Sequence, residues 1–529
     1  MKIWIVSREY AGIAEAGGVK NVACSLSENL VKLGNHVTLF IPLYGCTDIS
    51  SVKDYLCVWH KPVQVKVGDS LCHVCFAHGY SNGVEIVFIC HKSFSEKMGV
   101  YTYTSHEQTK DPSHIRGSGH HDTLFLNVLY QKAAVLYGLT CDKTEAPHII
   151  HCQDAAASLF PSFMENAKSS NQKLKKFFAH SRCVVTIHNA GPGYHHAFDN
   201  ISQASWYTGI QEADLSYGLN GCQVEPFLLA AKTSTLTTVS PQYAEEILSG
   251  ETETSGLSEC FRAKKIEIHG ITNGIDVSRY DPSDTNISLL PYPFKPEKRE
   301  LDGKLKCRDY FLEKFALEKA SSIEEGMEKF GYLDPDDESC VYIAYHGRIV
   351  TQKGISVLVR AAEILISQKL PVRFIITGQG QPELEKAIEN FAMSNPGKCV
   401  YFKGYSRFLS RLSIAAADFA VFPSFFEPCG LEDLIAQIYG TIPVAHATGG
   451  LCKIIDDETG FLYRNNTPEE LAMVLHSLTV IKVCAGKNIF NTMIAYTAVN
   501  VRKYFTWETV TREKYIPLYQ SLIKIPEFL

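Results

Sequence analysis

The chain has 529 residues, which is too long for a single hydrophobic core, so its length favours two or more domains. Hydrophobic residues make up 45% and charged residues 20%, a composition that excludes a disordered protein. The formal net charge of -6 argues against nucleic acid as the main partner, because a phosphate backbone attracts cationic surfaces.

The apolar runs of the chain predict a cytoplasmic location. The first run, Ile3 to Val6, is shorter than the apolar region of a signal peptide. No stretch approaches the roughly 18 apolar residues of a membrane helix. We therefore expect no export signal, no membrane association, and 17 cysteines that stay reduced.

The N-terminal half has the pattern of an α/β fold. Residues 3–6 predict a strand, which is followed by a glycine-containing loop and then by apolar residues at helical spacing from 19 to 30. Between 58 and 90, apolar and polar residues alternate around the turn 81–83, which predicts an antiparallel excursion. Further strands are predicted at 37–41, 148–150, 184–187 and 236–239.

The C-terminal half repeats a strand-helix rhythm. The stretch 281–337 is rich in Pro, Asp, Lys and Glu and has weak strand character, so the domain boundary is placed near its start. Short apolar strands separated by helical patterns such as 431–438 predict a parallel sheet covered on both faces. The strand candidates are 341–345, 372–377, 400–404, 419–423 and 443–445. Such sheets bind ligands beyond the carboxyl ends of their strands.

Two glycine pairs follow predicted strands in matching places. Gly17 and Gly18 come after the first strand, and Gly449 and Gly450 come after the strand at 443–445. Glycines allow a tight turn and leave backbone N–H groups at a helix N-terminus, where they can bind an anion. A tight turn without a ligand is the alternative for each pair alone.

Charged residues lie at two further strand ends. Arg348 and Lys353 follow the strand at 341–345, where a planar fork and a point charge can converge on one diphosphate. Glu427 lies in the aromatic and proline-rich run after 419–423, and its carboxylate suits hydrogen bonds to sugar hydroxyls. The alternatives are solvated surface cations and a helix-capping acid.

Taken together, these segments resemble the starch and glycogen synthase family of retaining glycosyltransferases, from the N-terminus to the C-terminus. The matching blocks are His151-Cys152-Gln153-Asp154, Thr186-Ile187-His188-Asn189, Thr238 to Tyr243, Gly270 to Asp276, Gly347 to Gly354, Phe426 to Leu431, Tyr439 to Pro443, Thr448 to Leu451, and Phe505-Thr506-Trp507.

The resemblance implies a GT-B fold, in which two Rossmann-like doubly wound domains face one another across a cleft. It implies an acceptor-side domain at 1–275, a nucleotide-sugar-binding domain at 276–504, and a C-terminal helix at 505–529 that crosses back to the first domain.

The resemblance also implies roles for individual residues. The residues implied in catalysis are Arg348, Lys353, Glu427, His188 and Asp154. Those implied in substrate binding are Glu15, Gly17, Gly18, Tyr405, Cys429, Gly430, Leu431, Thr448, Gly449 and Gly450. Neither a metal nor a cofactor is expected.

The function implied is transfer of glucose, with retention, from a nucleotide sugar to the non-reducing end of an α-1,4-glucan, with ADP-glucose as the expected donor and UDP-glucose as the alternative. The sequence departs from the family where Glu15 takes the place of a lysine and where Ala155 and Ala156 take the places of Trp and His. These departures keep open a catalytically silent glucan-binding or regulatory homologue. A nucleotide-sugar epimerase on the same fold is a further alternative.

Overall fold

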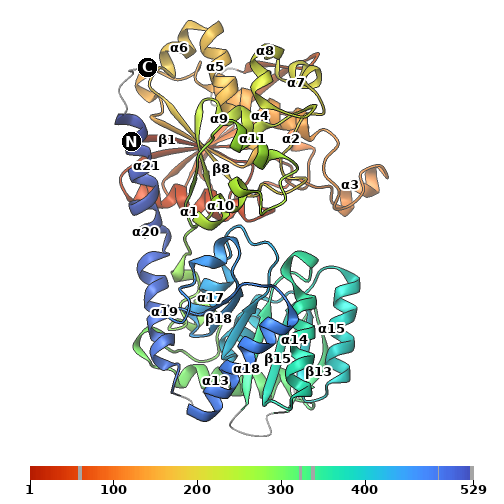
Figure 1. Cartoon of the computed structure of the whole chain (residues 1–529). Coiled ribbons are helices and arrows are strands. Elements are labelled where there is room, and N and C mark those ends of the chain that lie inside the picture. The colour runs from red at the N-terminus through yellow and green to blue at the C-terminus, as the bar shows by residue number, and fades with distance from the viewer. Residues whose placement is uncertain (58–61, 321–323, 335–339, 486–487, 525–529) are drawn as a thin grey trace. The chain divides into compact units, whose positions relative to one another are not determined.

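A computed structural model describes residues 1–57, 62–320, 324–334, 340–485 and 488–524 (Figure 1). The chain divides into two compact units. Unit 1 contains residues 1–273 together with 507–529, and unit 2 contains residues 274–506. The first residues of the predicted antiparallel excursion, 58–61, and the end of the predicted closing helix, 525–529, lie outside the described residues.

Unit 1 is built on a sheet with strand order β12-β11-β8-β7-β1-β2-β6-β5-β3, and β4 pairs with β5. From β12 to β6 neighbouring strands are parallel, whereas β3, β4 and β6 each run antiparallel to β5. The strands are β1 Lys2–Val6, β2 His36–Pro42, β3 Lys53–Leu56, β4 Val63–Val67, β5 Ser70–Ser81, β6 Val84–Cys90, β7 Ile149–Gln153, β8 Arg182–Ile187, β11 Ser234–Thr238 and β12 Ile268–Gly270, with β9 Leu219–Asn220 and β10 Gln223–Val224 as a separate pair.

The parallel strands β1, β2, β7, β8 and β11 of unit 1 confirm the strands predicted from the sequence. The turn at Asn82 and Gly83, with φ of 48° and 82°, joins β5 to β6, as the local sequence predicts. The predicted antiparallel excursion is only partly correct, because β6 pairs in parallel with β2 and belongs to the main sheet. The short edge strand β12 was not predicted.

The helices of unit 1 include a C-terminal pair that packs on its sheet. These helices are α1 Val19–Lys32, α2 Lys92–Ser95, α3 Ser105–Lys110, α4 Thr123–Tyr137, α5 Phe160–Ser170, α6 Gln172–Phe177, α7 Ile201–Thr208, α8 Glu212–Leu215, α9 Pro226–Ala231, α10 Pro241–Ser249, α11 Leu257–Ala263, α20 Trp507–Val510 and α21 Ile516–Lys524. Tyr519 of α21 is buried, and its hydroxyl lies 2.7 Å from Nδ1 of His151 in β7. The last helix therefore packs against β7 and belongs to unit 1.

Unit 2 has the strand order β13-β16-β15-β14-β17-β18-β19. Its strands are β13 Met327–Leu333, β14 Val341–His346, β15 Val372–Gly378, β16 Lys398–Gly404, β17 Phe419–Phe422, β18 Ile442–His446 and β19 Phe461–Tyr463. Its helices are α12 Thr285–Ser288, α13 Asp302–Phe311, α14 Ile355–Ser367, α15 Pro382–Ser394, α16 Arg407–Ala416, α17 Glu432–Ile438, α18 Pro468–Ala485 and α19 Asn491–Tyr504.

Both faces of the unit 2 sheet are covered. Along β14, Val341, Ile343 and Tyr345 belong to one buried cluster, while Tyr342 and Ala344 belong to another. The first cluster includes residues of α14, α15 and α18, and the second includes residues of α13, α16 and α17. This period of two is the signature of a strand that is buried on both sides. Unit 2 is therefore doubly wound, as predicted.

Strand β13 corrects the prediction of weak strand character between 281 and 337. It runs antiparallel to β16 at the edge of an otherwise parallel sheet. Its sequence, MEKFGYL, carries Glu328 and Lys329, and most of its residues are partly exposed. An edge strand contacts the core on fewer sides, so its sequence lacks the continuous apolar run that marks a central strand.

Among the described residues, no helix combines the length and apolarity needed to cross a membrane.

The hydroxyl of Tyr519 should stabilise unit 1. His151 is fully buried and bonds Tyr519 through Nδ1 and Thr186 through Nε2, at 2.7 Å and 2.6 Å. Tyr519→Phe keeps the ring but leaves Nδ1 without a partner, which should lower stability by about 1 to 3 kcal/mol. Thermal unfolding followed by tryptophan fluorescence measures this loss. The exposed Tyr194 of the same unit gives the control, since Tyr194→Phe should change nothing; equal melting temperatures for both variants would contradict the role of this bond.

Candidate functional site

The carboxyl ends of β14 and β17 in unit 2 carry two loops that are joined tightly. Gly354 has φ of 66°, and a Cβ at this position would lie 1.7 Å from the carbonyl oxygen of Pro423. The Gln352 carbonyl accepts the Phe425 N–H at 2.9 Å, and the Gln352 side chain donates to the Phe426 carbonyl at 2.9 Å. Only glycine permits this approach, so the two loops form one rigid edge.

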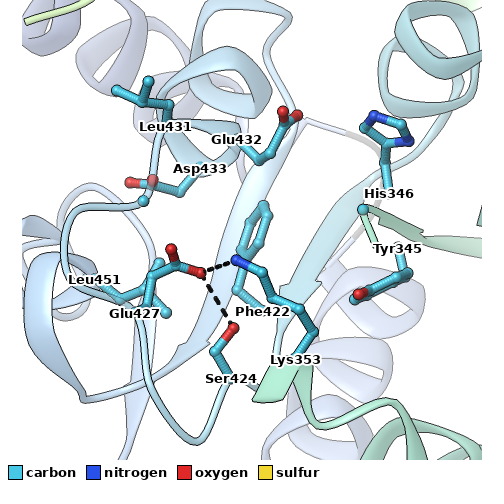
Figure 2. A pocket seen from close by; sticks show the side chains of 12 residues that line it. Tyr345, His346, Lys353, Phe422, Ser424, Glu427, Leu431, Glu432, Asp433 and Leu451 are labelled. Atoms are coloured by element: carbon cyan, nitrogen blue, oxygen red, sulfur yellow. Dashed lines mark hydrogen bonds and ion pairs between the residues drawn. The ribbon is translucent and has the colours of Figure 1, made fainter. Parts of the chain in front are cut away.

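A pocket opens at this edge, lined by residues of both loops and of the start of α17 (Figure 2). Lys353 and Glu427 point toward one another in it and form an ion pair. Ser424 donates from Oγ to Glu427 Oε2 at 3.2 Å. The structure therefore brings together two of the predicted catalytic residues, with opposite charges, in one cavity. The lining residues are Tyr345, His346, Gly347, Lys353, Phe422, Ser424, Glu427, Gly430, Leu431, Glu432, Asp433 and Leu451.

Arg348 and Tyr405 are among the predicted residues of unit 2 that lie outside the lining of this pocket. The Arg348 side chain is exposed, and its carbonyl accepts the Tyr345 hydroxyl at 2.8 Å. Tyr405 is 65% exposed. Both follow strands of the sheet, Arg348 after β14 and Tyr405 after β16, so they lie at the same edge as the pocket. Their roles in binding stay predictions.

The predicted glycine loop of unit 2 packs backbone to backbone against the Glu427 loop. A Cβ on Gly449 would lie 2.1 Å from the Glu427 carbonyl oxygen, and one on Gly450 would lie 1.8 Å from that of Cys429. The Gly450 N–H donates to the Glu427 carbonyl at 2.8 Å. Thr448 is buried and precedes this contact. The loop therefore fixes the position of Glu427 through its backbone.

Beneath these two loops lies a buried ion pair that sequence reasoning missed. Lys453 Nζ lies 2.8 Å from Asp433 Oδ1, and their side chains are only 5% and 0% exposed. Burial raises the pKa of Asp433 even though Lys453 opposes this shift. Lys453 stands two residues after the predicted loop and Asp433 two after Leu431, so only their spacing from the motifs could have drawn attention to them.

In unit 1, the first glycine loop is occupied by a side chain of the chain itself. Glu9, buried just after β1, accepts the N–H groups of Ala16 at 3.0 Å and Gly17 at 2.5 Å through Oε2. Sequence reasoning assigned the amides of this loop to an external anion. In the structure, two of these amides, those of Ala16 and Gly17, bind the carboxylate of Glu9 instead. A role of the Gly18 amide in binding an external anion stays a prediction.

Glu15 is held within the same loop. Its Oε1 accepts the Gly12 N–H at 2.6 Å, and its Oε2 lies 2.8 Å from Nζ of Lys20 in the first turn of α1. The carboxylate therefore braces the loop, and Lys20 balances its charge.

Asp154 and His188 follow the neighbouring strands β7 and β8, and the structure brings them together. Asp154 has φ of 66°, a conformation that non-glycine residues rarely adopt, and its Oδ1 accepts the His188 N–H at 3.2 Å. His188 Nε2 lies 2.8 Å from Gln153 Oε1. Burial raises the pKa of Asp154 to about 7 and lowers that of His188 to about 4. Strain and shifted pKa values are typical of functional sites.

Within the described part of the chain, no group of three or more His, Cys, Asp or Glu side chains is arranged to hold a metal ion.

Comparisons with known proteins match both units. Residues 2–263 match the family described as "Starch synthase catalytic domain", and residues 340–479 match "Glycosyl transferases group 1". The glycogen synthase of Thermodesulfovibrio yellowstonii is 29% identical over 537 residues, which cover 99% of this chain and 98% of the relative. That of Treponema denticola is 27% identical over 547 residues, with 99% of each chain covered.

A solved structure supports the fold. The catalytic domain of starch synthase IV from Arabidopsis thaliana, bound to ADP and acarbose, matches with a TM-score of 0.77 at 22% identity over 99% of both chains. A sucrose-phosphate synthase from Thermosynechococcus elongatus matches with a TM-score of 0.54 at 15% identity. These likenesses confirm the predicted GT-B fold of two Rossmann-like domains.

The buried histidines of unit 1 make its stability depend on pH. Burial lowers the pKa of His151 to about 3, and those of His120, His188 and His196 to about 4, from an ordinary 6.5. Between these values the unfolded chain binds more protons, so stability falls on acidification by about 1.4 kcal/mol per pH unit for each histidine. Two groups act in the opposite direction: Asp154, with its raised pKa of about 7, and His195, whose pKa is raised by its hydrogen bond to Glu225 although burial opposes this shift. The four histidines outnumber them.

We therefore expect unit 1 to lose stability steeply as the pH falls from 6.5 toward 4. Trp4, Trp206 and Trp507 belong to unit 1, while residues 274–506 contain no tryptophan, so tryptophan fluorescence reports this unit alone. Melting curves at pH 7.5, 6.0 and 5.0 should show a falling transition temperature. A transition temperature that stays constant or rises as the pH falls from 7.5 to 5.0 would show that the histidines are not buried in neutral form.

Proposed function

Because the chain belongs to the glycogen and starch synthase family of glycosyltransferases, we propose that it transfers glucose with retention from a nucleotide sugar to the non-reducing end of an α-1,4-glucan. The family membership favours a glycosyltransferase over the epimerase alternative. We propose ADP-glucose, in preference to UDP-glucose, as the donor, the cytoplasm as the location, and a reaction without metal or cofactor.

The ion pair between Lys353 and Glu427 is the observation that carries this proposal. The lysine is the residue proposed to hold the donor's diphosphate, and the glutamate is the one proposed to hold the hydroxyls of its glucose. Phosphate and glucose are neighbours in a nucleotide sugar, so one ligand would meet both side chains. The pocket at the carboxyl ends of β14 and β17 is where an open parallel sheet binds its ligands.

In the proposed reaction, negative charge develops on the departing diphosphate and positive character on the anomeric carbon of glucose. Arg348 and Lys353 stabilise the first, because fixed cations aimed at developing charge lower the barrier. Glu427 orients the sugar. The backbone of Cys429, Gly430 and Leu431, together with the loop Thr448 to Gly450, binds the nucleotide part, and Tyr405 lies against the base.

Asp154 and His188 belong to the acceptor side in this proposal. With a pKa of about 7, Asp154 exchanges its proton near neutral pH, while His188 stays neutral. A neutral imidazole and a carboxyl that carries a proton part of the time suit hydrogen bonds to sugar hydroxyls. The Glu15 side chain, engaged with Gly12 and Lys20, is compatible with donor binding because its charge is balanced within its own loop.

The choice of ADP-glucose follows the relatives. The matched starch synthase IV structure is bound to ADP and acarbose, so that protein binds an adenine nucleotide. Incubation of the purified chain with ADP-glucose or UDP-glucose and a glucan primer tests the proposal directly. Label should enter polymer faster from ADP-glucose. Glucan binding without transfer from either donor would refute it and favour a silent glucan-binding protein.

Removing either proposed cation should slow turnover strongly. We expect Arg348→Ala and Lys353→Ala each to lower kcat about 10²- to 10³-fold, because each substitution removes a fixed positive charge that stabilises the transition state. Initial rates at saturating donor measure the effect, with circular dichroism as a check on folding.

Lys386 provides the matched control for these substitutions. It lies on α15, and its side chain is 67% exposed. Lys386→Ala should retain the wild-type rate. Near-normal turnover in the Arg348 or Lys353 variant would remove that residue from the proposed mechanism.

A further inference from the structure

Lys453 is a buried lysine whose ammonium group binds the backbone of both loops of the unit 2 pocket. It donates to the carbonyl oxygens of Cys429 at 3.0 Å, Gly430 at 2.9 Å and Gly450 at 2.9 Å. The same ammonium group forms an ion pair with Asp433, whose Oδ1 lies 2.8 Å from Lys453 Nζ. One side chain thus connects the Glu427 loop to the glycine loop that packs against it.

The direction of these carbonyls fixes the direction of the adjacent N–H groups. In a trans peptide the C=O and N–H bonds point to opposite sides, and the described residues contain no cis peptide. Since the Cys429 and Gly430 carbonyls point at Lys453, the N–H groups of Gly430 and Leu431 point away from it. Both residues line the pocket, and neither N–H has an acceptor in the described part of the chain.

Two consecutive N–H groups beside a left-handed glycine form a concave site for an anion. Gly430 has φ of 67°, and a Cβ there would lie 3.1 Å from Asp433 Oδ1 and 3.3 Å from Lys453 Nζ. Any side chain at this position would press on the ion pair. The ion pair of Lys453 and Asp433 therefore requires a glycine at position 430.

We propose that Lys453 and Asp433 are positioning residues, which hold the amides of Gly430 and Leu431 toward the donor's diphosphate. This inference rests on the proposed function and goes beyond it, since neither side chain would touch the substrate. Lys453 holds the peptide groups by their carbonyl oxygens, and Asp433 supplies the opposite charge that makes a buried ammonium tolerable.

A purely structural role is the competing explanation, and the two can be separated. Replacing both members of a buried ion pair by uncharged residues is often neutral for stability, whereas removing one member is costly. If the pair serves only stability, Asp433→Asn combined with Lys453→Met should restore whatever Lys453→Met loses. If Lys453 orients the amides, the double variant regains melting temperature but not affinity for the nucleotide.

The experiment is a calorimetric titration of the full chain with ADP and with UDP. The wild type should prefer one of the two diphosphates. We expect Lys453→Met to bind that diphosphate with about tenfold lower affinity, and Asp433→Asn to lose less affinity. The double variant should melt close to the wild type and bind as weakly as Lys453→Met. In the transferase assay, KM for the donor should rise about tenfold, while KM for the glucan stays the same.

Lys304 gives the matched control, because it is another buried lysine of unit 2 that binds backbone carbonyls away from the pocket. Its Nζ donates to Ala415 at 2.7 Å, to Ala417 at 2.8 Å and to Thr441 Oγ1 at 2.8 Å. Lys304→Met should lower the melting temperature and leave diphosphate affinity unchanged.

The outcomes distinguish this inference from the proposed function. No binding of either diphosphate by the wild type would overturn both. Wild-type binding that Arg348→Ala weakens, but that Lys453→Met and the double variant leave within twofold, would overturn only the positioning role. Recovery of affinity in the double variant would also overturn it. If Lys453→Met alone fails to fold, the double variant and Asp433→Asn decide the question.

Discussion

The contact between the loops that follow β14 and β17 is the constraint on which the unit 2 site depends. Lys353 and Glu427 form its charged part, and the approach of Gly354 to the Pro423 carbonyl forms its backbone part. Because these loops end adjacent parallel strands, the sheet places them side by side before any side chain is considered. The ion pair is then a consequence of topology: an exposed lysine and glutamate would gain little from one another, whereas a partly buried pair in a fixed frame gains more.

Many of the strands and loops that form this site could be predicted from the sequence because local residue patterns specify them. Apolar runs marked the central strands β14, β15 and β17, and glycine pairs marked the loops. Strand β13 was missed because an edge strand shows no such run. The antiparallel pairing of β6 with β5 was predicted correctly, but its parallel pairing with β2 was missed because alternation alone does not say which further strand lies alongside. Pairing is a property of the folded sheet.

The same limit applies to the side chains around the sites. Glu9 was not singled out in the sequence, yet its carboxylate accepts the N–H groups of Ala16 and Gly17. Lys453 was not singled out in the sequence, yet it is buried and donates to three backbone carbonyls. Glu15 looked like a reversed charge at a binding loop, but its partner Lys20 lies five residues further along, in the first turn of α1. Each of these roles requires knowledge of which groups meet in space, which spacing in the sequence does not contain.

The glycine loop of unit 1 and the Glu427 loop of unit 2 are therefore held by groups of opposite charge, and this difference favours different roles for them. In unit 1 an acid holds the loop by its N–H groups, so the Ala16 and Gly17 amides are directed at Glu9 and already carry an anion. In unit 2 the Lys453 cation holds the Glu427 loop by its carbonyl oxygens, so the N–H groups of Gly430 and Leu431, two residues that line the pocket, point away from that cation. An incoming phosphate would have to displace a carboxylate at the first loop but nothing in the described residues at the second. Electrostatics alone thus favours unit 2 as the unit that receives the diphosphate, and leaves unit 1, with its buried neutral histidines and the partly protonated Asp154, better suited to an uncharged sugar.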